Sequence, residues 1–209
     1  MRKIIGASSI ALGLLCLLAA AGVVAYNHWE ERIGEQTAQT MLRDLQIRME
    51  YATAETVTQP PLEDETVQSS VPKPAVLQMQ TVQMADGECI GILSIPALEL
   101  ELPVLTDWSY EKLKKAPCHY YGSCYESDFV IAAHNYTSHF GRLTQLQAGD
   151  LVLFTDVAGQ THYYEVVLLE TLPPTATEEM ITSGFALSLY TCTPGGSNRV
   201  TVRCNSAKK

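Results

Sequence analysis

The chain has 209 residues, a formal net charge of −9 and 46% hydrophobic residues. This length suits one domain with appendages, or two very small domains. Because phosphate binding needs clustered positive charge, 14 basic against 23 acidic residues argue against nucleic-acid binding, and we expect no nucleic-acid partner. The charge is +2 over residues 1–28, −7 over residues 29–88 and −4 over residues 89–209, which predicts three segments.

Residues 1–28 have the composition of a cytoplasmic tip and a membrane anchor. Two basic residues precede an uncharged, mostly apolar run over residues 4–27, and two acidic residues follow it closely. A helix rises about 1.5 Å per residue, so this run is long enough for the roughly 30 Å hydrocarbon core. The flanking charges predict a single pass through the cell membrane across residues 4–26, with the N-terminus cytoplasmic and the rest extracellular. The alternative is a cleaved signal peptide, although a secretory apolar region is usually shorter, about 7–15 residues.

A helical stalk and a flexible spacer are predicted for residues 29–88. Residues 29–54 are rich in helix formers and carry a thin apolar stripe, made of Ile33, Met41, Leu45 and Met49. Such a helix is too polar to form a core of its own. Residues 55–88 contain four prolines among Thr, Gln, Val and acidic residues, a composition typical of a flexible spacer.

From Cys89 onward the sequence has the pattern of a β-domain. Short apolar and β-branched runs lie at residues 90–95, 98–105, 129–133, 151–155, 163–170, 186–193 and 199–204. Turns, or segments that contain Gly, Pro or Asp, separate most of these runs. Seven or eight strands leave little room for helix, apart from one short helix near residues 139–147. We therefore predict an all-β fold, a closed or nearly closed barrel.

Three reactive side chains lie at the ends of predicted strands. His134 follows the apolar strand FVIAA, Cys192 follows the strand ALSLYT, and Arg199 opens the last strand after a turn-rich loop. A scaffold can present such residues in a shared cleft. A nearby cation favours the thiolate of Cys192, His134 can protonate a leaving amine, and Arg199 can stabilise an oxyanion. The pattern predicts cysteine acyl transfer, with Arg203 as the alternative arginine.

The other cysteines leave several states open. Cys16 lies within the anchor. Five cysteines follow it: Cys89, Cys118, Cys124, Cys192 and Cys204. Because five is odd, at least one exported thiol is free or pairs with another chain. Cys118, His119 and Cys124 form half of a zinc-site pattern without a second close ligand pair, so we expect no metal. A Cys118–Cys124 disulfide and plain burial of both thiols are the alternatives, and no cofactor is expected.

Three segments together resemble the sortases, the cysteine transpeptidases of Gram-positive cell surfaces. Residues 89–105 (CIGILSIPALELELPVL) are similar to the opening strand pair, and residues 129–143 (FVIAAHNYTSHFGRL) to the catalytic-histidine segment. Residues 189–203 (LYTCTPGGSNRVTVR) resemble the Leu-x-Thr-Cys signature followed by the arginine strand. The resemblance implies a closed eight-stranded β-barrel with short helices, and it makes residues 89–209 the catalytic domain.

The resemblance also implies a reaction. Such an enzyme cleaves an LPxTG-like sorting signal of a surface protein after its Thr, holds a thioacyl intermediate and transfers it to an amine. The amine belongs to a peptidoglycan precursor or, in the pilus-polymerising class, to a pilin lysine. The subclass stays open. No Asp-Pro-aromatic lid precedes the barrel, which favours a small anchoring enzyme, but the loop after Cys192 resembles the pilus type.

Two residues next to the reactive pair, Thr191 and Ala133, are expected to contact substrate. Residues 172–176 (LPPTA) resemble a sorting signal, but they lie inside the predicted domain with no hydrophobic tail after them, so we expect a loop. Two other functions remain as alternatives. One is a surface cysteine protease or amidase that uses water as acceptor, and the other is an anchored β-barrel that binds a partner without catalysis.

Overall fold

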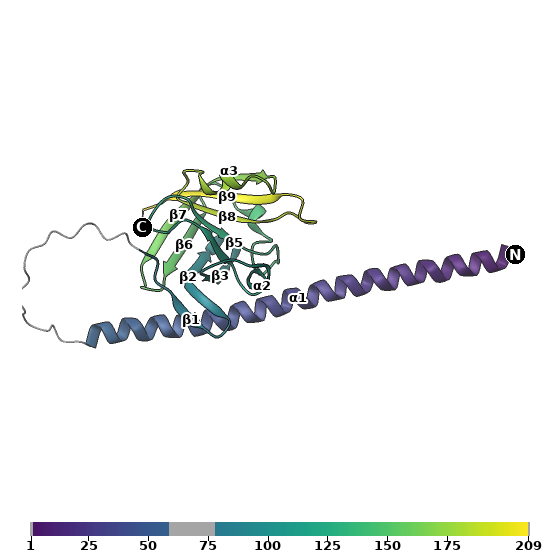
Figure 1. Cartoon of the computed structure of the whole chain (residues 1–209), viewed down its shortest axis with the longest axis horizontal. Helices are drawn as coiled ribbons and strands as arrows, with labels where there is room; N and C mark the ends of the chain where they lie inside the picture. Colours follow the sequence, from purple (N-terminus) through teal and green to yellow (C-terminus); the bar gives the residue numbers. More distant parts are fainter. Residues whose placement is uncertain (1, 59–77, 209) are drawn as a thin grey trace, which may run out of the picture.

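The computed structural model describes residues 2–58 and 78–208. Its first element is one long helix, α1 (Arg2–Thr58), which runs through the predicted anchor and stalk without a break. Figure 1 shows this helix passing along one side of a β-barrel, with its N-terminal end extending well beyond the barrel. Most of the predicted spacer, residues 59–77, lies outside the described residues.

The N-terminal part of α1 could cross a membrane. Within the described part of the chain, α1 is the one helix that is long and apolar enough to do so. Its most apolar stretch is not buried against any other described element, and Leu12, Leu17 and Val23 are 62%, 70% and 60% exposed. Lipid is a suitable environment for such side chains, because a helix satisfies its own backbone hydrogen bonds.

Nine strands of the described residues form one sheet, in the order β1-β2-β3-β4-β5-β8-β9-β7-β6. They are β1 (Val82–Met84), β2 (Gly87–Ile95), β3 (Leu100–Leu105), β4 (Cys118–Tyr121), β5 (Phe129–Ala132), β6 (Leu151–Asp156), β7 (Thr161–Leu172), β8 (Leu187–Cys192) and β9 (Arg199–Ser206). Strand β2 also pairs with β6, which closes an eight-stranded barrel and leaves β1 as an extra strand on β2. The pairs β3–β4 and β5–β8 are parallel and the others antiparallel. The predicted closed eight-stranded barrel is confirmed.

Four short helical segments connect the strands. They are η1 (Pro96–Leu98), α2 (Tyr110–Leu113), η2 (Leu143–Gln145) and α3 (Thr177–Ile181). The helix expected near residues 139–147 is only the three-residue 3-10 turn η2. Strands β1 and β4 lie outside the predicted runs, because three or four residues show too little alternation to indicate a strand.

The barrel interior is filled by apolar side chains that alternate along the strands. In β6, for example, Val152 and Phe154 are buried whereas Leu151 is exposed. Other fully buried members of this core come from distant parts of the chain: Leu93, Phe129, Ile131, Leu189 and Val202. This packing holds the ends of β5, β8 and β9, where the predicted reactive residues lie.

A second apolar cluster joins α1 to the outside of the barrel. Its α1 members are Met41, Leu42 and Leu45, and Leu45 is completely buried. Its barrel members lie on or next to β1, β2, β3 and β4, and include Met84, Cys89, Ile92, Leu105 and Cys118. The predicted apolar stripe is therefore packed on the barrel along part of its length, which gives the polar helix the core that it cannot form alone.

Helix α1 also contacts two loops, the one that follows α2 and the one that follows β5. The carboxylate of Glu31 accepts a hydrogen bond from the backbone N–H of Thr137 at 2.6 Å, and Glu30 forms an ion pair with Lys114 at 2.7 Å. Gly34 permits this close approach, because a Cβ at its position would lie 2.6 Å from the carbonyl oxygen of Lys114. The helix is thus tied to the barrel near His134.

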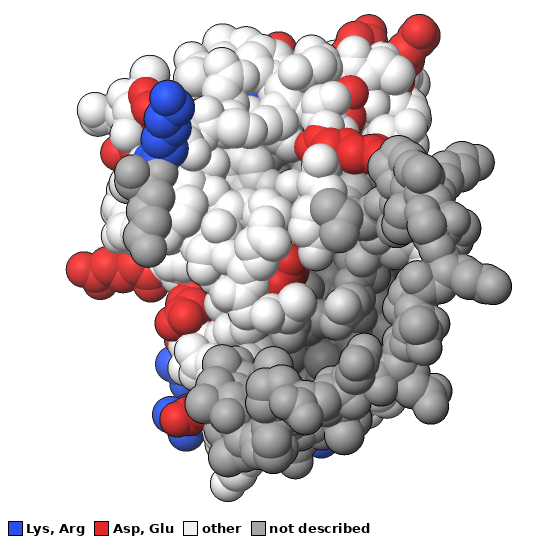
Figure 2. Space-filling view, turned by 90° about the vertical axis from the view of Figure 1, so that its left-hand side faces the viewer, with Lys and Arg blue, Asp and Glu red and all other residues white. Residues whose placement is uncertain are grey.

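Charged residues are sparse on the face of the molecule shown in Figure 2. Most of its described surface is uncharged, acidic side chains are scattered over it, and basic side chains lie mainly at one edge. This face therefore offers no broad positive surface to a phosphate backbone.

Candidate active site

Parallel pairing of β5 with β8 places His134 and Cys192 at the same end of the barrel. The two strands run in register with a constant offset of 58 residues, as far as Ala132 and Tyr190. Beyond the last pair, the backbone N–H of Ala133 donates to the carbonyl of Tyr190 at 3.1 Å. His134 follows the last paired residue of β5 by two positions, and Cys192 is the last residue of β8.

The antiparallel pair β8–β9 brings Arg199 to the same position. Cys192 and Arg199 are register partners at the end of this pair where the connecting loop begins and ends. The loop between them turns through Gly195 and Gly196, which have φ angles of 81° and 76° that favour glycine. Nη1 of Arg199 donates to the carbonyls of Gly196 at 3.0 Å and Asn198 at 3.1 Å, and no other N–H of this guanidinium is bonded to a described residue.

The alternative arginine, Arg203, has a different environment. It is 2% exposed, and its guanidinium donates to the carboxylate of Glu170 at 2.7 Å, to the hydroxyl of Ser188 at 2.8 Å and to the carbonyl of Glu179 at 2.7 Å. These contacts tie β9 to β7, to β8 and to α3. Arg203 therefore has a structural role in the barrel, and Arg199 is the arginine beside Cys192.

Cys192 differs from the other cysteines that follow the anchor. It is half-buried, whereas Cys89, Cys118, Cys124 and Cys204 are buried and make no disulfide. Burial raises the pKa of Cys89 to about 11 and those of Cys118, Cys124 and Cys204 to about 12. These four thiols therefore keep their protons at neutral pH, and Cys192 is the one described cysteine after the predicted anchor that is not buried.

Cys192 and Arg199 line a groove of about 210 Å³, and apart from Ala133 the sequence did not indicate its other lining residues as substrate contacts. Aromatic side chains form one part of it, with Trp108 packed on Tyr120 at 5.7 Å and Tyr120 on Tyr190 at 5.4 Å between ring centroids. Its other lining residues include Ala132, Ala133, Pro173, Pro174, Ala176 and Met180. These residues are far apart in the sequence, so no local motif connects them.

The two residues expected to contact substrate lie in different environments. Ala133 lines the groove. Thr191 is 3% exposed, and its hydroxyl donates to the carbonyl of Ala133 at 2.9 Å, so it joins β8 to the end of β5. The LPPTA segment contains the end of β7 and the loop before α3, and this loop forms one wall of the groove.

The ring of His134 is held by two neighbours. It stacks on Tyr136 with ring centroids 4.3 Å apart, and its Nδ1 lies 3.3 Å from the side-chain oxygen of Asn135. Its Nε2 has no hydrogen-bond partner among the described residues. A nearby second histidine, His139, is fully buried, and burial with the charge of His134 lowers its pKa to about 4.

The half zinc-site pattern of Cys118, His119 and Cys124 does not assemble. Both ring nitrogens of His119 face backbone carbonyls, those of Thr106 at 3.0 Å and Gly122 at 2.8 Å. Cys118 lies in the apolar cluster with α1, whereas Cys124 belongs to the barrel core, and no bond joins the two sulfurs. Of the two alternatives to a zinc site, the disulfide is absent, and both thiols are buried.

Comparisons with known proteins agree with this fold. A family model described as "Sortase domain" matches residues 93–207. Among solved structures, sortase C1 from Streptococcus suis is 30% identical, with a TM-score of 0.52 over 58% of this chain and 74% of that one. Sortase C from Streptococcus pneumoniae is 24% identical, with a TM-score of 0.53 over 80% of this chain and 90% of that one. Sortase A from Corynebacterium diphtheriae is 24% identical, with a TM-score of 0.52, and this chain covers 61% of its length. No curated protein matches the sequence.

Proposed function

Because the chain belongs to the sortase family, we propose that it is a membrane-anchored cysteine transpeptidase that cleaves an LPxTG-like sorting signal. His134, Cys192 and Arg199 are the catalytic residues of this proposal. The observation that supports it is the position of the half-buried Cys192 as register partner of Arg199 in β8–β9, at the end of the barrel where β5 ends two residues before His134.

The first half of the reaction forms a thioester. The thiolate sulfur of Cys192 attacks the carbonyl carbon of the signal's Thr, and the carbonyl oxygen becomes an oxyanion. The free N–H groups of Arg199 donate to this oxyanion. As the tetrahedral intermediate collapses, the C–N bond breaks and protonated His134 gives its proton from Nε2 to the leaving amine.

The second half transfers the acyl group. An amine of a peptidoglycan precursor or a pilin lysine enters where the first amine left and attacks the thioester carbon, while His134 takes its proton. The C–S bond then breaks, so Cys192 leaves as the thiolate and the enzyme is regenerated. His134 thus acts as the acid in the first half of the cycle and as the base in the second, two roles that an imidazole can take.

The groove suits an extended, partly apolar peptide. Aromatic and proline side chains surround the entrance to Cys192, and the acidic residues of the chain are not among those that line it. Leu and Pro of a sorting signal bury apolar surface against such walls, at roughly 25 cal/mol per Å². Ala133 is among the residues that line the groove, and in this proposal it contacts the bound peptide.

The anchor sets where the reaction occurs. With residues 4–26 in the membrane and the N-terminus cytoplasmic, α1 would leave the membrane and reach the barrel within a few residues, since Glu30 and Glu31 already contact it. The active site would then work close to the outer membrane surface, where surface proteins emerge and lipid-linked cell-wall precursors lie.

Mass spectrometry of the full chain in detergent tests the proposal. After incubation with a peptide that contains an LPxTG signal, we expect an acyl adduct on Cys192 that an added amine removes as a peptide–amine product. If only water removes the adduct, even when the amine is present, the protein is a protease or amidase and not a transpeptidase. If the folded protein forms no adduct and its Cys192 does not react with a thiol reagent, the protein is a binding module. Cys118→Ala is the matched control, and it should form the adduct normally.

A further inference from the structure

A second group of reactive side chains lies at the opposite end of the barrel from Cys192. Cys124 precedes β5, Asp156 ends β6 and His162 is the second residue of β7. Each offers one ligand atom, and these atoms all lie within 4.8 Å of one another. The group shares no residue with the groove, which is built where β5 and β8 end.

The carboxylate of Asp156 is buried without a permanent positive charge beside it. The residue is 1% exposed, and one oxygen accepts from the backbone N–H of Gln160 at 2.9 Å. The other oxygen accepts from the hydroxyl of Tyr125 at 2.8 Å and lies 3.4 Å from Nε2 of His162. No Lys or Arg of the described chain pairs with it. Buried carboxylates are normally paired with a cation or coordinate a metal.

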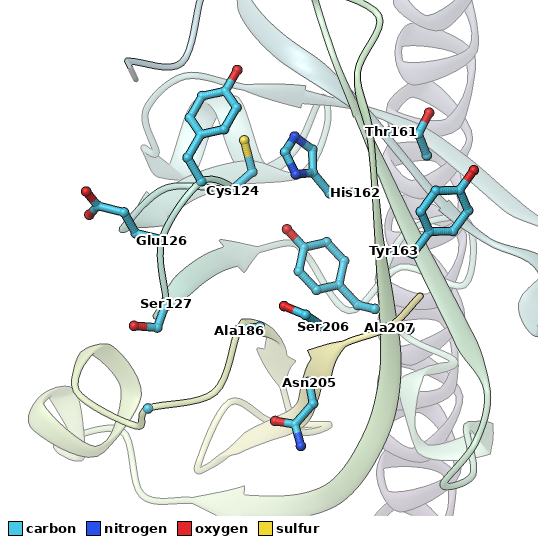
Figure 3. A pocket seen from close by; sticks show the side chains of 13 residues that line it. Cys124, Glu126, Ser127, Thr161, His162, Tyr163, Ala186, Asn205, Ser206 and Ala207 are labelled. Carbon is cyan, nitrogen blue, oxygen red and sulfur yellow. The ribbon is translucent and has the colours of Figure 1, made fainter. Parts of the chain in front are cut away.

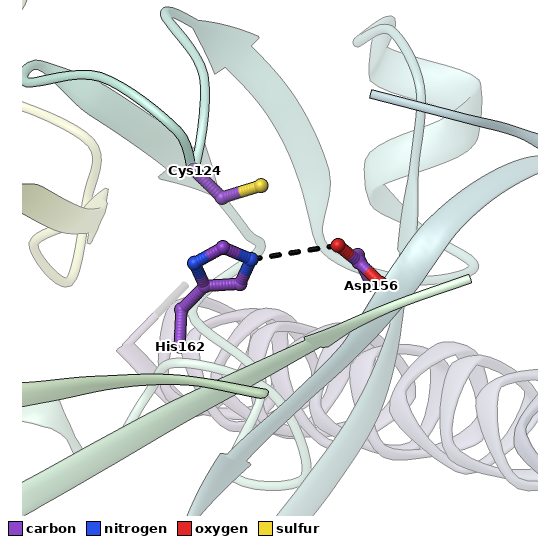
Figure 4. A group of neighbouring side chains, drawn as sticks. All are labelled: Cys124, Asp156 and His162. Carbon is purple, nitrogen blue, oxygen red and sulfur yellow. Dashed lines mark hydrogen bonds and ion pairs between the residues drawn. The ribbon is translucent and has the colours of Figure 1, made fainter. Parts of the chain in front are cut away.

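Figure 4 shows how the three side chains converge. The sulfur of Cys124 and the carboxylate of Asp156 both lie on the Nε2 side of the His162 ring. In a nucleophile–histidine–carboxylate relay, the two ring nitrogens serve the nucleophile and the carboxylate separately. Here the sulfur and the carboxylate instead lie on the same side of the ring, as they would if all three side chains bound one ion.

A cavity of about 690 Å³ gives access to this group. Cys124 and His162 lie next to each other among its lining residues, as Figure 3 shows. Tyr164 also lines it, and its buried hydroxyl has no hydrogen-bond partner among the described residues. A water molecule on an ion at this position would have both the space and a polar neighbour.

We propose that Cys124, Asp156 and His162 bind one divalent transition-metal ion, most suitably Zn²⁺, with an open fourth position toward the cavity. Thiolate, imidazole and carboxylate together are typical zinc ligands, whereas Ca²⁺ and Mg²⁺ prefer oxygen alone. Bond lengths of about 2.0–2.3 Å place tetrahedral ligand atoms roughly 3.3–3.8 Å apart, so side-chain shifts of about 1 Å close the site.

Metal binding at this site replaces the proton of the Cys124 thiol. The metal forms bonds to Sγ of Cys124, a nitrogen of His162 and an oxygen of Asp156, and the thiol proton leaves for solvent through the cavity. Tyr125 keeps its hydrogen bond to Asp156 and orients the carboxylate. The ion would join the loop before β5 to the β6–β7 hairpin, two parts of the barrel that share no strand pairing.

Cobalt spectroscopy of the full chain in detergent tests this site without any peptide substrate. After removal of metal with EDTA, the protein should take up one Co²⁺ per chain and show a thiolate-to-cobalt charge-transfer absorption band, which Zn²⁺ abolishes by replacement. Cys124→Ser and His162→Gln should each weaken binding at least 100-fold, and Cys124→Ser should remove the band. Cys118→Ser, which changes another buried thiol, should stay within twofold of wild type. Absence of uptake by the wild type, or a band that survives in Cys124→Ser, would overturn the proposal.

A measurement on the unchanged protein covers the case in which the variants do not fold. Zn²⁺ should slow the labelling of Cys124 by a thiol reagent at least tenfold and leave the labelling rate of Cys192 unchanged. Equal rates for Cys124 with and without Zn²⁺ would contradict the site. Because neither experiment depends on acyl transfer, failure here leaves the proposed transpeptidase untouched, and failure of the transpeptidase leaves the metal site untouched.

Discussion

The imidazole of His134 lies flat against the phenol ring of Tyr136, with their planes 3° from parallel and their centroids 4.3 Å apart. The same tyrosine faces helix α1, because a Cβ on Gly34 would come within 3.1 Å of its ring. The side chain that stacks on the candidate acid–base is therefore packed between the barrel and the helix whose N-terminal part could cross a membrane. One ring thus contacts both α1 and His134, and we expect the position of the helix to influence the orientation of the imidazole.

Gly34→Val tests this coupling. The added side chain meets a backbone carbonyl and the Tyr136 ring, so we expect overpacking to cost about 1–3 kcal/mol of stability and to lower peptide turnover. Thermal unfolding and kcat measurements check both effects. Gly22→Ala is the matched control, since a Cβ there meets nothing within 4 Å, and it should change neither quantity. Normal turnover in Gly34→Val would show that α1 does not influence His134.

Removal of residues 1–28 should leave the fold and the peptide turnover in solution intact, because these residues make no described contact with the groove. Leu45→Ala should instead destabilise the barrel by about 2–5 kcal/mol, since Leu45 is completely buried against it. Denaturant unfolding of the shortened protein, with and without the substitution, measures the difference. A surface substitution changes the free energy of unfolding by up to about 0.5 kcal/mol. If Leu45→Ala changes it by no more than this, α1 does not pack on the barrel in solution.

Arg199→Ala should lower peptide turnover by about 10²–10³, as loss of other oxyanion donors does. Arg199→Lys should restore little of it, because lysine keeps the charge but loses the planar set of donors. The Lys variant should recover most of the reactivity of Cys192 toward a small alkylating agent, since charge alone favours the thiolate. Full recovery of turnover by Lys would show that charge suffices.

Arg203→Ala should behave differently from Arg199→Ala. Its guanidinium is buried and bonded to Glu170, so we expect a loss of about 3–5 kcal/mol in unfolding free energy. At temperatures where the variant remains folded, turnover per folded molecule should stay close to wild type. A stable Arg203→Ala protein without turnover would transfer the oxyanion role from Arg199 to Arg203.

Acid should destabilise the protein through His139. Its folded-state pKa of about 4 lies below the value of about 6.5 in an unfolded chain, so the unfolded state binds the proton more tightly. Its contribution is complete above pH 6.5 and falls as the pH drops toward 4, by up to about 3 kcal/mol. Denaturant unfolding between these pH values measures this slope. His139→Gln should flatten it, whereas His28→Gln, which changes an exposed histidine, should not.

The sequence alone indicated the barrel and its candidate reactive residues because both predictions depend on local patterns. Apolar alternation marks a strand that has one face in a core, and a polar residue directly after such a strand marks its end. His134, Cys192 and Arg199 each follow or open such a run, so they were recognisable before any pairing was known. Their common position then followed from the β5–β8 and β8–β9 registers.

Only the tertiary structure decided which surfaces meet. Trp108, Tyr120 and Pro173 share a groove, Leu45 is buried on the barrel, and Cys124 lies beside Asp156 and His162. The residues in each contact are separated in sequence by distances that match neither the helix period nor the strand period. A strand as short as β4 shows too little alternation of apolar and polar residues to be recognised in the sequence. Alternation along one strand reports which face is buried. It does not report which distant side chain covers that face, because pairing depends on the closure of the whole barrel.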